Sequence, residues 1–297
     1  MPAGPALGPP SDAGEALMMA DGVRLPLRSW APEGEPRGVI LALHGFNDYS
    51  RAFDLPSPLF TGAGWLLYAY DQRGFGATEA RGIWAGADTL AADAVTAATL
   101  IRARHPSLPL ILLGESMGGA VLLVAGTRAD PPPADGYVLS APAVWGGETM
   151  GETGRWFLNV FAHTVPALGI VGGSPFIRAS DNEAALIALG RDPLVPRSTR
   201  VDAIWGLVAL MDAALEASRR FDHPALVLYG ARDDIVPEKA ITALRERLPG
   251  LADGRQRLIG YERGYHLLLR DSGRTQVATD ILAWMEGGAA VVAAAPS

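Results

Sequence analysis

The chain has 297 residues, of which 49% are hydrophobic and 19% charged, with a net charge of −7 and Lys239 as its single lysine. This hydrophobic content is enough for the core of one large domain or two ordinary ones, and it excludes disorder over most of the length. The acidic balance excludes the basic face of a nucleic-acid-binding protein. With no cysteine in the sequence, disulfides and thiolate metal sites are excluded as well.

The first residues, "MPAGPALGPPSDAG", contain neither a basic segment nor an apolar one, so they predict no signal peptide. Their Pro/Gly content predicts a flexible leader over residues 1–15. On the sequence as given we expect a cytoplasmic protein. A periplasmic or lipid-anchored protein is the alternative if an added Met replaced a removed signal.

Strands and helices alternate along most of the chain. An Asp21-Gly22 turn predicts a hairpin between two short extended runs. Continuous apolar runs predict strands at 38–45, 65–71, 109–116, 136–143, 224–233 and 255–261, and helical patterns lie at 88–104, 117–126, 237–247 and 274–285. Uninterrupted apolar strands indicate a sheet covered on both faces, and the alternation predicts a doubly wound α/β sheet.

The alternation stops over residues 146–221, which predict a helical cap inserted between two core segments, 16–145 and 222–286, before a flexible tail at 287–297. The uncharged run Trp156–Ile177 is long enough to span a bilayer, but glycines, a proline and polar residues interrupt it, so we interpret it as an apolar lid. Trp145, Trp156 and Phe161 are the candidate substrate-binding residues, although some of the apolar side chains must form the cap's own core. Such a cap suits an acyl chain better than a peptide or sugar.

The segment Gly114-Glu115-Ser116-Met117-Gly118 lies where a predicted strand turns into a predicted helix. Glycine on both sides of the serine removes the two Cβ atoms that would collide with the neighbouring strand or helix, so the strained central residue projects its hydroxyl clear of the sheet. The helix that begins at Met117 also points free N–H groups at whatever the serine attacks. Ser116 is therefore the candidate nucleophile.

A serine nucleophile needs a base and an orienting carboxylate. Of the five histidines, His266 has the best position, because it follows the last predicted strand in "YERGYHLLLRD", where ligand sites gather in open α/β sheets. Asp233 and Asp234 follow another predicted strand, and one of the pair suits the N-cap of the helix at Pro237. The chain order Ser, Asp, His is typical of α/β-hydrolase scaffolds.

These segments, together with "LALHGFNDYS", "YDQRGFGAT" and "GARDDIVP", resemble the α/β-hydrolase family in its monoacylglycerol lipase and lysophospholipase branch, which is grouped with serine aminopeptidase-like hydrolases. The resemblance extends from about Ala16 to Met285. It implies the α/β-hydrolase fold, a mostly parallel doubly wound sheet with an inserted helical cap.

The resemblance also assigns site residues. It implies Ser116, Asp233 and His266 as the catalytic triad, and the backbone N–H groups of Phe46 and Met117 as the oxyanion hole. It leaves Asp234 for the helix N-terminus.

Three further residues near these segments receive structural interpretations. We expect Asp71 and Arg73 to be structural residues that pair with each other. Glu115 stands where relatives often carry histidine, and we expect it to be pinned in a local hydrogen-bond network.

These residues predict a carboxylic ester hydrolase that acts on hydrophobic single-chain esters, such as monoacylglycerols or lysophospholipids, through an acyl-serine intermediate. We expect no cofactor, no metal ion and no nucleic-acid partner, and a peripheral lipid-surface contact through the cap. Three alternatives stay open: an aminopeptidase or amidase, for which Glu148 and Glu152 are the nearest acidic residues in the cap, an acyltransferase or perhydrolase on the same triad, and a non-catalytic ligand receptor.

Overall fold

The computed structural model describes residues 2–145, 162, 164, 166–170 and 177–292. Its centre is a sheet with the strand order β1-β2-β3-β5-β4-β6-β7-β10-β11. The strands β5, β4, β6, β7, β10 and β11 are parallel to one another, and β1 to β3 extend the sheet antiparallel. The bounds of these strands are β1 Ser11–Asp12, β2 Ala16–Met18, β3 Arg24–Trp30, β4 Gly38–Leu43, β5 Trp65–Tyr70, β6 Leu110–Glu115, β7 Gly136–Ser140, β10 Ala225–Gly230 and β11 Gln256–Tyr261.

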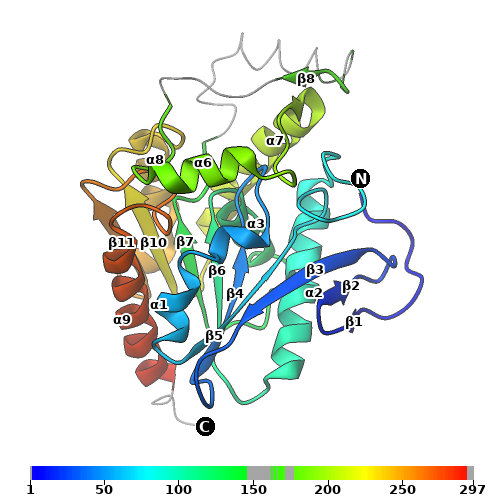
Figure 1. Ribbon diagram of the computed structural model, residues 1–297. Helices are drawn as coiled ribbons and strands as arrows, with labels where there is room; N and C mark the ends of the chain where they lie inside the picture. Colours follow the sequence, from blue (N-terminus) through cyan, green and yellow to red (C-terminus); the bar gives the residue numbers. More distant parts are fainter. Residues whose placement is uncertain (1, 146–161, 163, 165, 171–176, 293–297) are drawn as a thin grey trace.

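Helices cover both faces of this sheet (Figure 1). One apolar cluster joins the sheet to α2 (Ala87–Arg104), α3 (Met117–Ala125), α7 (Val201–Ala217) and α8 (Glu238–Arg247), and the other joins it to α1 (Ser57–Thr61) and α9 (Arg274–Val292). In β4, Val39 and Leu41 belong to the first cluster and Ile40 and Ala42 to the second. Because both faces of the strand are buried, its sequence is uninterruptedly apolar, and the predicted doubly wound α/β architecture is confirmed.

The predicted hairpin is also confirmed. Strands β2 and β3 pair antiparallel around Gly22, whose φ of 78° lies in the left-handed region that favours glycine. Residues 2–15, expected to be a flexible leader, lie against this hairpin: β1 pairs with β2, and the N–H of Leu7 donates to the carbonyl oxygen of Ala20.

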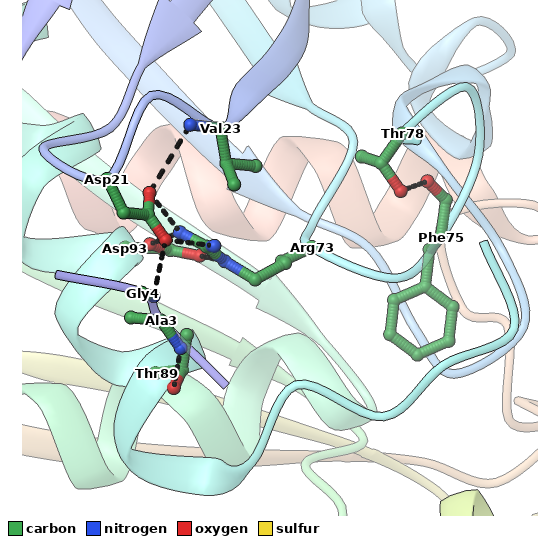
Figure 2. A network of polar contacts seen from close by, with 9 residues as sticks. All are labelled: Ala3, Gly4, Asp21, Val23, Arg73, Phe75, Thr78, Thr89 and Asp93. Atoms are coloured by element: carbon green, nitrogen blue, oxygen red, sulfur yellow. Dashed lines mark hydrogen bonds and ion pairs between the residues drawn. The ribbon is translucent and has the colours of Figure 1, made fainter. Parts of the chain in front are cut away.

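The loop after β5 contradicts the expected pairing of Asp71 with Arg73. Arg73 instead forms buried ion pairs with Asp93 of α2, at 2.8 Å, and with Asp21 of the hairpin turn, at 2.6 Å (Figure 2). Asp71 accepts hydrogen bonds from the N–H groups of Ser50 and Ala77 and so holds two loops together. The two side chains therefore have separate partners: Arg73 joins the hairpin turn to α2, whereas Asp71 binds backbone N–H groups of the loops beside the site.

The cap range contributes α6 (Glu183–Arg191), a two-stranded pair of β8 (Gly169–Ile170) with β9 (Thr199–Arg200), and α7. Figure 1 shows α6 lying across the carboxyl ends of the parallel strands, whereas α7 runs down to pack against α3. Most of the run Trp156–Ile177 lies outside the described residues. Within them, no helix combines the length and apolar character needed to cross a bilayer.

Short 3-10 turns complete the fold. They are η1 (Ser50–Phe53), η2 (Ser218–Arg220) and η3 (Pro249–Leu251). The first of them follows β4 and leads into the helix α1 beside the carboxyl ends of the strands, so the chain after β4 passes close to the site described next.

Candidate active site

Ser116 occupies a sharp turn between β6 and α3. Its φ of 52° and ψ of −114° are strained for a residue with a side chain. A Cβ at Gly114 would lie 2.5 Å from the backbone of Gly118, and a Cβ at Gly118 would overlap the backbone oxygen of Leu43. Both glycines are therefore required by close backbone contacts, and the turn presents the Ser116 hydroxyl at the carboxyl end of the sheet.

His266 lies in the loop after β11 and reaches the serine. Its Nε2 is 2.9 Å from Oγ of Ser116. The imidazole is 4% exposed, so bulk water does not compete for this contact. Asp271 closes the loop around the histidine, because its carboxylate accepts from the N–H of Tyr265 at 2.7 Å and from the hydroxyl of Ser180 at 2.6 Å.

Asp233 lies on the other side of the imidazole, with Oδ2 2.8 Å from Nδ1 of His266. Its second oxygen accepts from the N–H groups of Ile235 and Val236, both at 2.8 Å, which fixes the carboxylate in the turn after β10. An ionised carboxylate only accepts hydrogen bonds, so Nδ1 carries the proton and Nε2 is left to accept from the hydroxyl of Ser116. The three side chains form one hydrogen-bonded chain from carboxylate to hydroxyl.

The neighbouring aspartate has a different role from the expected one. Asp234 is exposed, and its carboxylate accepts from the N–H of Arg178 at 3.1 Å. Helix α8 has Pro237 at its N-cap without a side-chain cap hydrogen bond, so the expectation that Asp234 caps this helix is wrong. Asp233 already satisfies the N–H groups of the preceding turn, and the chain leaves Asp234 pointing toward the cap.

Two backbone N–H groups border the serine. Met117 is the first residue of α3, where the helix leaves its first N–H groups without helical partners. Phe46 lies in the loop after β4, and its ring packs edge-on against the ring of Phe75. The next residue of this loop, Asn47, has a φ of 57°. Among the described residues, neither N–H donates to a protein acceptor. Both are thus available to a developing negative charge, and their assignment as an oxyanion hole stays a prediction.

The residue before the serine, Glu115, is buried and bound to Arg270, which lies four residues after His266. Burial raises the pKa of the Glu115 carboxyl, and the nearby arginine opposes that effect. The other amino group of the Arg270 guanidinium is 2.7 Å from a carboxylate oxygen of Asp48. The expected pinning of Glu115 is confirmed. Its partner Arg270 could not be predicted, because a buried arginine in an apolar run carries no periodic signal.

Of the other four histidines, the three that lie among the described residues do not reach the serine. His105 ends α2 and bonds to the hydroxyl of Tyr68, and His223 bonds to the carbonyl oxygen of Gly126. His44 is fully buried, accepts from the N–H of Gln72 at Nε2, and faces the carbonyl oxygen of Gly45 with Nδ1. Burial lowers the pKa of His44, so its neutral form is favoured in this structural position.

The candidate substrate-binding residues are only partly placed. Trp145 is half-buried and packs against the larger apolar cluster of the core. Trp156 and Phe161 lie outside the described residues, as does His163. Within the described part of the cap, the large apolar side chains of Leu168, Ile170 and Ile177 are exposed by 51%, 44% and 52%.

The cap also touches the loop that carries Phe46. The side-chain amide of Asn47 donates to the hydroxyl of Thr199 at 2.6 Å, and the hydroxyl of Tyr49 donates to Asp192 at 2.7 Å. The candidate oxyanion loop is therefore held from both the core and the cap.

The chain is similar to known hydrolases. The family described as serine aminopeptidase, S33, matches residues 34–273. The chain is 26% identical to a monoacylglycerol lipase of Mycolicibacterium smegmatis, over 89% of this chain and 93% of that protein. It is 28% identical to the monoglyceride lipase of Mus musculus, over 86% and 84%.

The crystal structure of Paleococcus ferrophilus monoacylglycerol lipase superposes with a TM-score of 0.71 at 23% identity, over 89% of this chain and 99% of that one. This similarity confirms the expected α/β-hydrolase fold, with its mostly parallel sheet and flanking helices.

Proposed function

Because the chain belongs to the serine aminopeptidase S33 family, we propose that it is an ester hydrolase in which Ser116 is the nucleophile, His266 the general base and Asp233 the residue that orients the histidine. The observation that carries the proposal is the continuous hydrogen-bonded chain, with 2.8 Å between Asp233 and His266 and 2.9 Å between His266 and Ser116. This arrangement is what activation of a serine hydroxyl requires.

In the first half of the reaction, Nε2 of His266 takes the proton of Ser116 as Oγ attacks the carbonyl carbon of the ester. The carbonyl oxygen gains negative charge, and the N–H groups of Phe46 and Met117 donate to it. The histidine becomes an imidazolium, which the buried carboxylate of Asp233 stabilises. The tetrahedral intermediate collapses when the imidazolium gives its proton to the departing alcohol oxygen.

The second half repeats these steps with water. His266, neutral again, takes a proton from a water molecule that attacks the acyl-Ser116 carbonyl. The same two N–H groups hold the second oxyanion, and proton return to Oγ of Ser116 releases a carboxylic acid and the free enzyme. Over the two halves, one ester and one water molecule become one alcohol and one carboxylic acid, and His266 returns to its neutral form.

For the substrate, we propose a single-chain hydrophobic ester of the monoacylglycerol type. The two relatives carry the names monoacylglycerol lipase and monoglyceride lipase and align over most of their lengths. The exposed apolar side chains of Leu168, Ile170 and Ile177 in the cap support the same substrate class and a peripheral contact with a lipid surface.

Amide hydrolysis is the alternative that the family description raises, and the test must separate it from ester hydrolysis. The experiment compares turnover of a monoacylglycerol, a lysophospholipid and an aminoacyl anilide by the purified protein, with a Ser116→Ala variant as the control. We expect rapid, Ser116-dependent turnover of the monoacylglycerol. Faster turnover of the anilide than of both lipids would contradict the proposal.

A further inference from the structure

Arg270 is a buried cation that the proposed chemistry does not use. Its guanidinium binds two buried carboxylates, Glu115 and Asp48, through different terminal nitrogens. Although burial alone would lower the pKa of Arg270, the two carboxylates raise it, so the group stays charged. The cluster therefore places one guanidinium between two buried carboxyl groups close to Ser116.

The three residues come from the three segments that carry the site. Glu115 directly precedes Ser116, Asp48 lies two residues after Phe46, and Arg270 lies four residues after His266. One planar guanidinium thus connects the nucleophile turn, the candidate oxyanion loop and the histidine loop.

We propose that Arg270 is a positioning residue for catalysis. Its contact with Glu115 fixes the His266 loop relative to Ser116, and its contact with Asp48 fixes the same loop relative to the N–H of Phe46. The proposal rests on the proposed function, because it assigns a role in the geometry of that same site. The side-chain hydrogen bonds of Arg270 go to Asp48 and Glu115, and not to Ser116 or His266.

The geometry favours this role because the contacts are directional. A guanidinium is rigid and planar, so binding two carboxylates at once fixes their relative positions, which a flexible ammonium group would not do. Catalysis is sensitive to such positions, since displacement of a reacting group by about 1 Å costs about a hundredfold in rate. Asp48 and Arg270 lie outside helices and strands, whereas Glu115 is the last residue of β6, so the side-chain contacts tie two loops to the end of the strand that leads into Ser116.

Comparison with Arg73 separates positioning from simple stabilisation. Arg73 is also buried between two carboxylates, Asp21 and Asp93, and all three of its nitrogens donate to them (Figure 2). Arg270 leaves its Nε buried without a partner among the described residues. The two buried arginines differ in the segments that they join, since Arg73 joins the hairpin turn to α2 and Arg270 joins the three segments of the site.

The experiment compares Arg270→Met with Arg73→Met, which removes a buried cation whose partners lie outside the three site loops. Steady-state kinetics with a short soluble ester are measured well below each variant's unfolding temperature. We expect both variants to unfold at lower temperature than the wild type. Only Arg270→Met should lose kcat, by about tenfold to a hundredfold, with KM changed less than about threefold. Arg270→Lys, which can pair well with one carboxylate at a time, should lie between Arg270→Met and wild type.

A double variant tests the proposal even if Arg270→Met folds poorly. Adding Glu115→Gln removes one of the carboxylates left uncompensated in the core, so the double variant should recover thermal stability while kcat stays low. Recovery of kcat together with stability would overturn the proposal, as would an equal loss of kcat in Arg73→Met. Wild-type turnover that does not depend on Ser116 would instead overturn the proposed function, so the two failures are distinguishable.

Discussion

Replacing Asp233 with asparagine is the change that examines the proposed triad most closely. The asparagine keeps one oxygen to accept from the N–H groups of Ile235 and Val236, so the turn after β10 should remain folded. Its amide NH₂ then faces Nδ1 of His266 in place of Oδ2, 2.8 Å away in the native protein. An NH₂ group donates, so Nδ1 must accept and the imidazole proton moves to Nε2.

That tautomer points an N–H at Ser116 and cannot take the serine proton. By analogy with the corresponding change in serine proteases, kcat should fall about 10⁴-fold, equivalent to about 5.5 kcal/mol in the activation free energy. The assay is steady-state hydrolysis of a soluble ester, with circular dichroism to establish that the variant is folded.

Asp234→Asn is the matched control. It makes the same chemical change one residue along, on an exposed side chain whose described contact is the N–H of Arg178. We expect unchanged kcat and a change in the free energy of unfolding within about 0.5 kcal/mol, as for most surface substitutions. Loss of activity in Asp234→Asn with activity retained in Asp233→Asn would show that Asp233 does not orient His266.

Three further predictions concern the turn, the buried histidine and the cap. Gly118→Ala should destabilise the fold by at least about 3 kcal/mol in urea unfolding, because its Cβ would overlap the backbone oxygen of Leu43; a stable, active variant would contradict this. Burial lowers the pKa of His44 below its ordinary 6.5, so its contribution to stability is fully present above pH 6.5 and is lost as pH falls, since the unfolded chain then takes up a proton that the native state does not. Relative to His44→Gln, which keeps an acceptor for Gln72, the wild type should lose up to about 1.4 kcal/mol of unfolding free energy per pH unit below this value, and equal pH slopes would contradict the assignment. KM should fall about fourfold per added acyl methylene until the pocket is full, at about 0.8 kcal/mol each, and a flat series from acetate to octanoate would show that the apolar cap residues do not line the pocket.

Much of the fold and of the candidate site could be predicted from the sequence because those features follow from local rules. Uninterrupted apolar runs mark strands that are buried on both faces, as in β4. Glycines two residues before and after Ser116 indicate positions where a Cβ would collide with neighbouring backbone atoms. Loops after parallel strands meet at one edge of the sheet, so Asp233 and His266 could be placed near the serine before any distance was known.

The side-chain partners could not be predicted in the same way. Arg73 pairs with Asp21, which is 52 residues away along the chain, and not with nearby Asp71. Arg270 reaches Asp48 across 222 residues. Such contacts depend on how distant loops pack, and neither spacing nor periodicity records that packing.

In the proposed mechanism, Ser116 forms a covalent acyl intermediate. The most direct test is to identify which residue a covalent serine-directed probe modifies. The protein would be treated with an alkyl fluorophosphonate, digested, and analysed by mass spectrometry, with Ser116→Ala treated in parallel. We expect one stoichiometric adduct on the peptide that contains Ser116, matching loss of esterase activity in the wild type, and no adduct in the variant. Labelling of a different serine, or esterase activity retained by Ser116→Ala, would contradict this mechanism.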